Sequence, residues 1–135
     1  MPRRLVVIAV VVGGLLIGAA SAQAFVAKLA APGHHPTAGK RWVITVSARR
    51  SNGGPVHASS YYQFVFNGQV VATRYPTPNN PRRGHRNKPW KFRGSYRDSI
   101  IWPKRAVGQP LVFRVVVHQR HGGTKRLNYA VTVRQ

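Results

Sequence analysis

Apolar and polar side chains alternate with a period of two along most of the chain after residue 40. In residues 41–50, for example, Trp42, Ile44 and Val46 occupy alternate positions. Successive side chains of a strand point to opposite faces, so this pattern predicts a strand with one face against a core. β-branched and aromatic residues, which strands favour, dominate such segments. The segments predicted to be strands are 25–30, 41–50, 57–66, 69–74, 91–102, 110–119 and 125–134.

The dipeptide Asn67-Gly68 separates two of these segments. Both residues tolerate positive φ, which is typical of the type I′ turn of a two-residue β-hairpin. The hairpin register predicts that Phe64 faces Val71 and that Val65 faces Val70. After residue 24 the chain shows no helical period of 3.6 residues. The side chains predicted to face the core are Trp42, Phe64, Phe66, Phe113, Val115, Tyr129 and Val131.

About seven short strands with regularly spaced turns are typical of an immunoglobulin-like antiparallel β-sandwich. The region 25–135 resembles the secreted immunoglobulin-like β-sandwich domains of bacterial exported proteins, many of which have no assigned function. The resemblance rests on Lys40-Arg41-Trp42 at the start of a strand, Tyr62-Gln63-Phe64 before the hairpin, Trp102-Pro103, and Pro110-Leu111 through Val117. It implies an all-β fold and a role in recognition rather than catalysis.

The first 24 residues have the order of a secretory signal peptide. Arg3 and Arg4 form a basic head, residues 5–20 are uncharged and apolar, and Ala22 and Ala24 are small residues at the positions that signal peptidase reads. We therefore expect a signal-peptide helix at 1–24, one domain at 25–135, and a location outside the cytoplasm, secreted or at the cell surface. We expect cleavage after Ala24, so that the mature protein begins at Phe25; cleavage after Ala22 and a retained membrane anchor are the alternatives.

The chain is strongly basic, with 22 Lys and Arg residues and a single acidic residue, Asp98. Removal of Arg3 and Arg4 with the leader would lower the formal charge from +21 to +19. Such a charge favours contact with polyanions, for example acidic cell-wall polymers, polysaccharides, nucleic acids or anionic lipids. GC-rich codons also specify Arg, Ala, Gly and Pro, so part of the arginine content has a compositional explanation.

Few residues in this chain can carry out chemistry. One carboxylate excludes a paired-carboxylate hydrolase, and the chain has no G-x-S-x-G nucleophile motif. The spacing of its six histidines matches no catalytic zinc pattern. We therefore expect no catalytic residue, no metal site, no cofactor and no small-molecule substrate, and we expect Asp98 to pair with an arginine or to cap a turn.

The most distinctive segment is 74–93, which contains four prolines and a run of cations interleaved with aromatic residues. Its cations can bind anionic backbones, and an aromatic ring can stack on a base or a sugar. The alternative is a solvated loop whose Trp90 packs back onto the rim of the sandwich. The candidate polyanion-binding residues are Arg82, Arg83, Arg86, Lys88, Trp90, Lys91 and Arg93.

Two functions are therefore predicted. The first is a secreted, non-enzymatic binding module that contacts a polyanionic polymer or a protein partner. The alternative is a secreted cationic effector that binds nucleic acid or anionic membrane surfaces.

Overall fold

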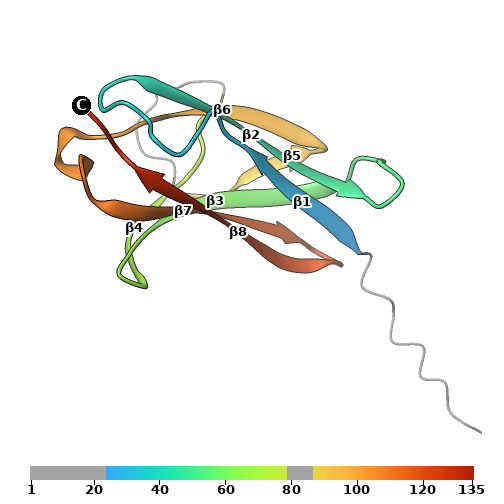
Figure 1. Ribbon diagram of the computed structural model, residues 1–135. Helices are drawn as coiled ribbons and strands as arrows, with labels where there is room; N and C mark the ends of the chain where they lie inside the picture. The colour runs from blue at the N-terminus through green and yellow to red at the C-terminus, as the bar shows by residue number, and fades with distance from the viewer. Residues whose placement is uncertain (1–23, 79–86) are drawn as a thin grey trace, which may run out of the picture.

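The computed structural model describes residues 24–78 and 87–135, which form two antiparallel β-sheets (Figure 1). One sheet has the strand order β1-β2-β6, and the other has the order β4-β3-β7-β8, with β5 also paired to β3. The elements are β1 (Phe25–Ala30), β2 (Arg41–Arg50), β3 (His57–Phe66), β4 (Gln69–Arg74), β5 (Trp90–Arg93), β6 (Ser95–Ile101), the 3₁₀-helix η1 (Lys104–Ala106), β7 (Pro110–Gln119) and β8 (Gly123–Thr132). The predicted all-β class is confirmed.

The strand predicted at 91–102 is wrong, because this segment forms two strands in different sheets. β5 pairs with β3, whereas β6 pairs with β2. The chain changes sheets at Gly94, whose φ is +79° and whose N–H donates to the carbonyl of Val56. A Cβ at this position would lie 3.1 Å from Cβ of Pro55. The alternation of side chains continues across Gly94, so periodicity alone did not reveal the break.

The hairpin between β3 and β4 has the predicted turn, because Asn67 has φ 49° and Gly68 has φ 76°. Val65 faces Val70 as predicted, but Phe64 faces Ala72 rather than Val71. A bulge between Phe64 and Val65 causes this shift. A bulge leaves one residue of a strand unpaired. Val71 is that residue, and its side chain is 57% exposed.

The core lies between the two sheets and is rich in aromatic rings. Phe113 is fully buried, and its ring centroid lies 5.5 Å from that of Trp42 and 5.1 Å from that of Tyr62. The predicted core residues Trp42, Phe113, Val115 and Val131 are buried. Phe64 and Tyr129 are half-buried and pack against the core, whereas Phe66 is half-buried outside the core cluster.

The predicted signal peptide falls almost wholly on residues 1–23, which lie outside the described residues. Within 24–78 and 87–135, no helix is long and apolar enough to cross a membrane.

Candidate functional site

The acidic side chain of Asp98 lies between the sheets rather than on the surface. Asp98 is 8% exposed, and its carboxylate accepts hydrogen bonds of 2.8 Å from the hydroxyl of Tyr62 and from the backbone N–H of Ser99. The expected arginine partner is therefore wrong for the described residues, among which no ion pair to Asp98 occurs. Because Asp98 is the only acidic residue of the sequence, the described surface carries no acidic side chain.

A second polar contact joins the sheets beside Asp98. The hydroxyl of Tyr96 on β6 donates to Oγ of Ser60 on β3 at 2.9 Å. Burial raises the pKa of Tyr62 above its ordinary value, and the neighbouring Tyr96 and Asp98 raise it further. Burial also raises the pKa of Tyr96, although its hydrogen bond to Ser60 opposes the shift. Burial therefore favours the neutral form of both phenols, and their hydrogen bonds to Asp98 and Ser60 join the two sheets.

The candidate residues of the basic loop divide into two groups. Arg82, Arg83 and Arg86 lie outside the described residues. Lys88, Lys91 and Arg93 are exposed, as a polyanion contact requires.

Trp90 is placed differently from its charged neighbours. Its side chain packs against the core and is only partly exposed. Successive side chains of a strand alternate, so Trp90 and Phe92 lie on the opposite face of β5 from Lys91 and Arg93. The ring of Trp90 therefore does not lie on the same face of β5 as these two cations, and its part in polyanion binding stays a prediction.

Lys91 and Arg93 belong to a larger group of basic side chains on the outer face of the five-stranded sheet. Pairing places Arg93 beside His57, and Ser59 between Lys91 and His118. Ala58, Ser60 and Tyr62 face inward, so their neighbours on β3 face outward. We call this surface the basic face, and its residues are His57, Lys91, Arg93, Arg114, His118 and Arg126.

Arg114 is fixed in the middle of the basic face. Its Nε donates to Oδ1 of Asn128 at 2.8 Å, and its Nη1 donates to Oε1 of Gln63 at 3.3 Å. The rings of Tyr61 and Tyr75 pack beside each other with centroids 6.1 Å apart. Because amides hold Arg114 without neutralising it, the charge of the guanidinium remains available to an anion.

Sequence reasoning missed most of the basic face because its residues come from four strands that are far apart in the chain. A run of neighbouring cations is visible in the sequence, whereas single cations on alternating positions of separate strands are not. One feature of the sequence could have found them: in each alternating segment the polar positions are expected to face solvent. Arg114, His118 and Arg126 occupy such positions. Strand order is needed before such positions can be joined into one surface.

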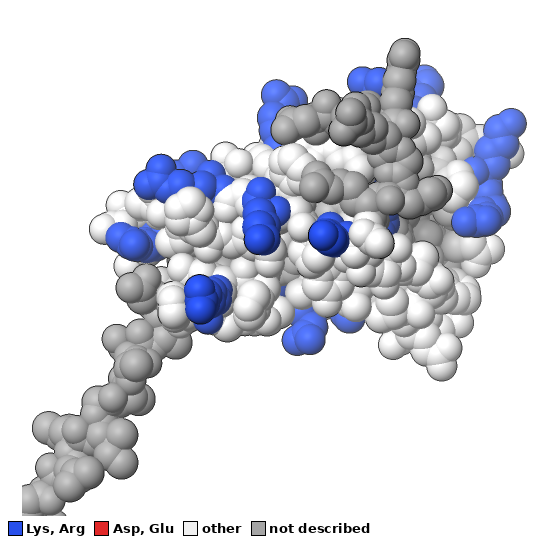
Figure 2. All heavy atoms as spheres, turned by 180° about the vertical axis from the view of Figure 1, so that it is seen from behind, with Lys and Arg blue, Asp and Glu red and all other residues white. Residues whose placement is uncertain are grey.

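Lys and Arg side chains are also spread over other parts of the described surface. Figure 2 shows one face of the molecule on which they are distributed with no acidic side chain between them. The described histidines do not gather: within 24–78 and 87–135 there is no group of three or more His, Cys, Asp or Glu residues that could hold a metal ion. His34 instead stacks on Tyr129, with ring centroids 4.1 Å apart.

No protein-family model matches the chain, and no curated protein matches it. Among solved structures, it is similar to a DUF4466 family protein from Parabacteroides merdae ATCC 43184, with 12% sequence identity and a TM-score of 0.43. The match covers 81% of this chain and 45% of that protein, so the chain spans less than half of that protein's length. Similarity at this level carries no inference about function, which rests on the chain's own residues.

Proposed function

We propose that this protein is a secreted or cell-surface binding module without enzymatic activity, and that it binds a polyanionic polymer through the basic face. The observation that carries the proposal is the burial of Asp98. With its single acidic residue inside, the described surface offers Lys and Arg side chains that no carboxylate side chain neutralises. A polyanion therefore meets no repulsive side chain wherever it approaches this surface.

The strand order supports an immunoglobulin-like topology for the module. In such domains, strands A, B and E share one sheet, and strands C, F and G share the other. Here β1, β2 and β6 correspond to the first set, and β3, β7 and β8 correspond to the second. β4, on the free edge of β3, corresponds to an additional C′ strand. Domains of this architecture commonly act in recognition, which favours binding over catalysis.

The arrangement of the basic face suits a polymer better than a single small anion. Lys91 and Arg93 are two positions apart, so they lie about 7 Å from each other along β5. Arg114 and Arg126 extend the same face across β7 and β8, with about 4.8 Å between neighbouring strands. Cations repeated over this distance can contact successive anionic groups of one chain, and each contact releases counterions.

The test compares two triple variants that remove the same charge from opposite sheets. Lys91→Ser/Arg93→Ser/Arg126→Ser removes three cations from the basic face, and Lys28→Ser/Arg41→Ser/Arg97→Ser removes three exposed cations from the β1-β2-β6 sheet. Binding to heparin and to duplex DNA is measured over a range of salt concentrations. We expect the basic-face variant to flatten the log–log salt dependence on DNA by roughly 0.9 for each lost phosphate contact.

The control variant is expected to change this slope less. Equal losses in the two variants would overturn the assignment to the basic face and would make binding a property of the whole surface. Absence of salt-sensitive binding to either polymer would overturn the proposal itself. Retention on anionic liposomes but not on heparin, DNA or purified cell wall would favour the alternative, a cationic effector directed at membranes.

A further inference from the structure

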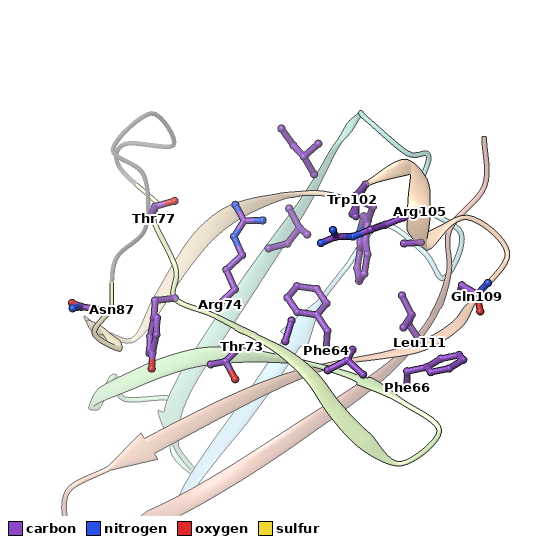
Figure 3. Close-up of a pocket in the computed structure, with 17 residues that line it drawn as sticks. Phe64, Phe66, Thr73, Arg74, Thr77, Asn87, Trp102, Arg105, Gln109 and Leu111 are labelled. Atoms are coloured by element: carbon purple, nitrogen blue, oxygen red, sulfur yellow. The ribbon is translucent and has the colours of Figure 1, made fainter.

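A groove of about 1030 Å³ opens between the edges of the two sheets, on a different part of the molecule from the basic face (Figure 3). One wall comes from β4 at the edge of the five-stranded sheet, and the other comes from the end of β6 and from η1. This volume lies at the upper end of the range of about 300–1,000 Å³ that is usual for small-molecule sites. The space therefore accommodates an organic molecule rather than a single ion.

The groove has an apolar, aromatic lining. Phe64 packs edge to face on the buried ring of Trp102, with ring centroids 5.3 Å apart, and Leu111 and Ala72 also line the groove. Ile101 and Val71, which also line the groove, are 51% and 57% exposed. Exposed apolar side chains that border a concave apolar surface are typical of a binding site.

Two arginines from different elements complete the groove. Arg74 is the last residue of β4, and its pairing with the inward-facing Tyr62 places it on the groove side of that strand. Arg105 belongs to η1. Figure 3 shows both side chains extending into the groove from its two walls. Both residues are exposed, and neither forms an ion pair within the described part of the chain.

The lining also contains an unsatisfied hydrogen-bond donor. Nε1 of Trp102 is buried without a hydrogen-bond partner, whereas Nε1 of Trp42 donates to the carbonyl of Gly33 at 3.1 Å. A buried N–H without an acceptor is costly, and such groups are rare in folded proteins. Because this atom is buried, a ligand in the groove does not reach it in this conformation.

We propose that the groove binds a small amphiphilic anion, with its apolar chain or ring on Phe64, Ile101 and Leu111 and its carboxylate or phosphate head group between Arg74 and Arg105. The planar guanidinium group matches either head group with two parallel hydrogen bonds. The apolar body supplies the affinity that distinguishes this ligand from inorganic anions. The inference does not depend on polymer binding, because the two sites share no residue.

Isothermal titration of the protein with dodecanoate and dodecyl phosphate below their micelle concentrations tests the proposal. Arg74→Ser/Arg105→Ser is expected to weaken binding about ten- to a hundredfold, since charge-assisted hydrogen bonds are lost. Arg97→Ser/Arg120→Ser is the matched control, because it removes the same charge from exposed positions outside both the groove and the basic face. Ala72→Trp, at an exposed position of β4, is expected to fill the groove and weaken binding without a change of charge.

Further ligands separate the contributions of the head group and the body. Dodecyltrimethylammonium has the same tail with the opposite charge, and acetate has the head group without the tail, so neither is expected to bind. A stronger response to one of the two dodecyl anions would identify the preferred head group. The proposal would be overturned if the control double variant weakened binding equally or if Ala72→Trp left binding unchanged. It would also be overturned if acetate bound, or if neither dodecyl anion bound. The groove variant Arg74→Ser/Arg105→Ser is expected to leave the salt dependence of heparin binding by the basic face unchanged.

Discussion

The hydrogen bond between Tyr62 and Asp98 joins the two sheets, and its removal should lower stability more than any surface change. Tyr62 is fully buried on β3, and its hydroxyl donates to Oδ2 of Asp98 on β6 at 2.8 Å. Tyr62→Phe keeps the ring and its contact with Phe113 but leaves the carboxylate without this donor. Hydrogen bonds to charged groups contribute about 1.5–3 kcal/mol, so we expect the free energy of unfolding to fall by roughly that amount.

Urea unfolding followed by tryptophan fluorescence measures this loss. Tyr61→Phe is the matched control, because it removes a hydroxyl from the outward-facing neighbour and should cost less than about 0.5 kcal/mol. Asp98→Ala combined with Tyr62→Phe completes a double-mutant cycle, for which we expect a coupling energy of about 1.5–3 kcal/mol. Additive single losses, or a loss in Tyr62→Phe no greater than in Tyr61→Phe, would refute the reasoning.

Two further predictions concern the core. Phe113→Ala should lower the free energy of unfolding by about 3–5 kcal/mol. Phe64→Ala should lower it by less, because Phe64 is only half-buried. Denaturant midpoints of the two variants check this order, and a larger loss in Phe64→Ala would contradict it. Because the pKa values of Tyr62 and Tyr96 are raised in the native state, both residues keep protons that the unfolded state releases at high pH. Their contribution to the free energy of unfolding should therefore be fully present below pH about 10. Above that pH, the free energy of unfolding should fall by about 1.4 kcal/mol per pH unit for each tyrosine. Urea titrations between about pH 9 and 11.5 should show a shallower fall for Tyr96→Phe than for the native protein, and identical slopes would argue against the neutral phenols as the cause.

The sequence by itself determined the all-β class and most strand boundaries, because the information for both is local. Alternation with a period of two depends only on which face of a strand meets the core. β1, β2, β3, β4 and β7 have the predicted bounds, and the Asn67-Gly68 turn has the predicted positive φ values. The bulge beside Phe64 was not predicted, because it shifts the pairing of β3 with β4 without disturbing the alternation of apolar and polar residues along β3.

Only the tertiary structure decided which strands share a sheet, and the candidate sites follow from that decision. Gly94 moves the chain from one sheet to the other, which separates β5 from β6 within what looked like a single strand. The same pairing directs Lys91 and Arg93 to the basic face while Trp90 packs against the core. Their neighbours on that face come from β3, β7 and β8, at distances along the chain that no local pattern spans.

The burial of Asp98 and the groove between the sheet edges have the same origin. The sequence predicted that Asp98 pairs with an arginine or caps a turn, yet the stacking of β6 on β3 brings its carboxylate to the hydroxyl of Tyr62. Arg74 and Arg105 lie 31 positions apart and come together only because β4 and β6 are the facing edges of different sheets. Local composition determines which elements form, whereas long-range pairing between them determines which charges and rings become neighbours.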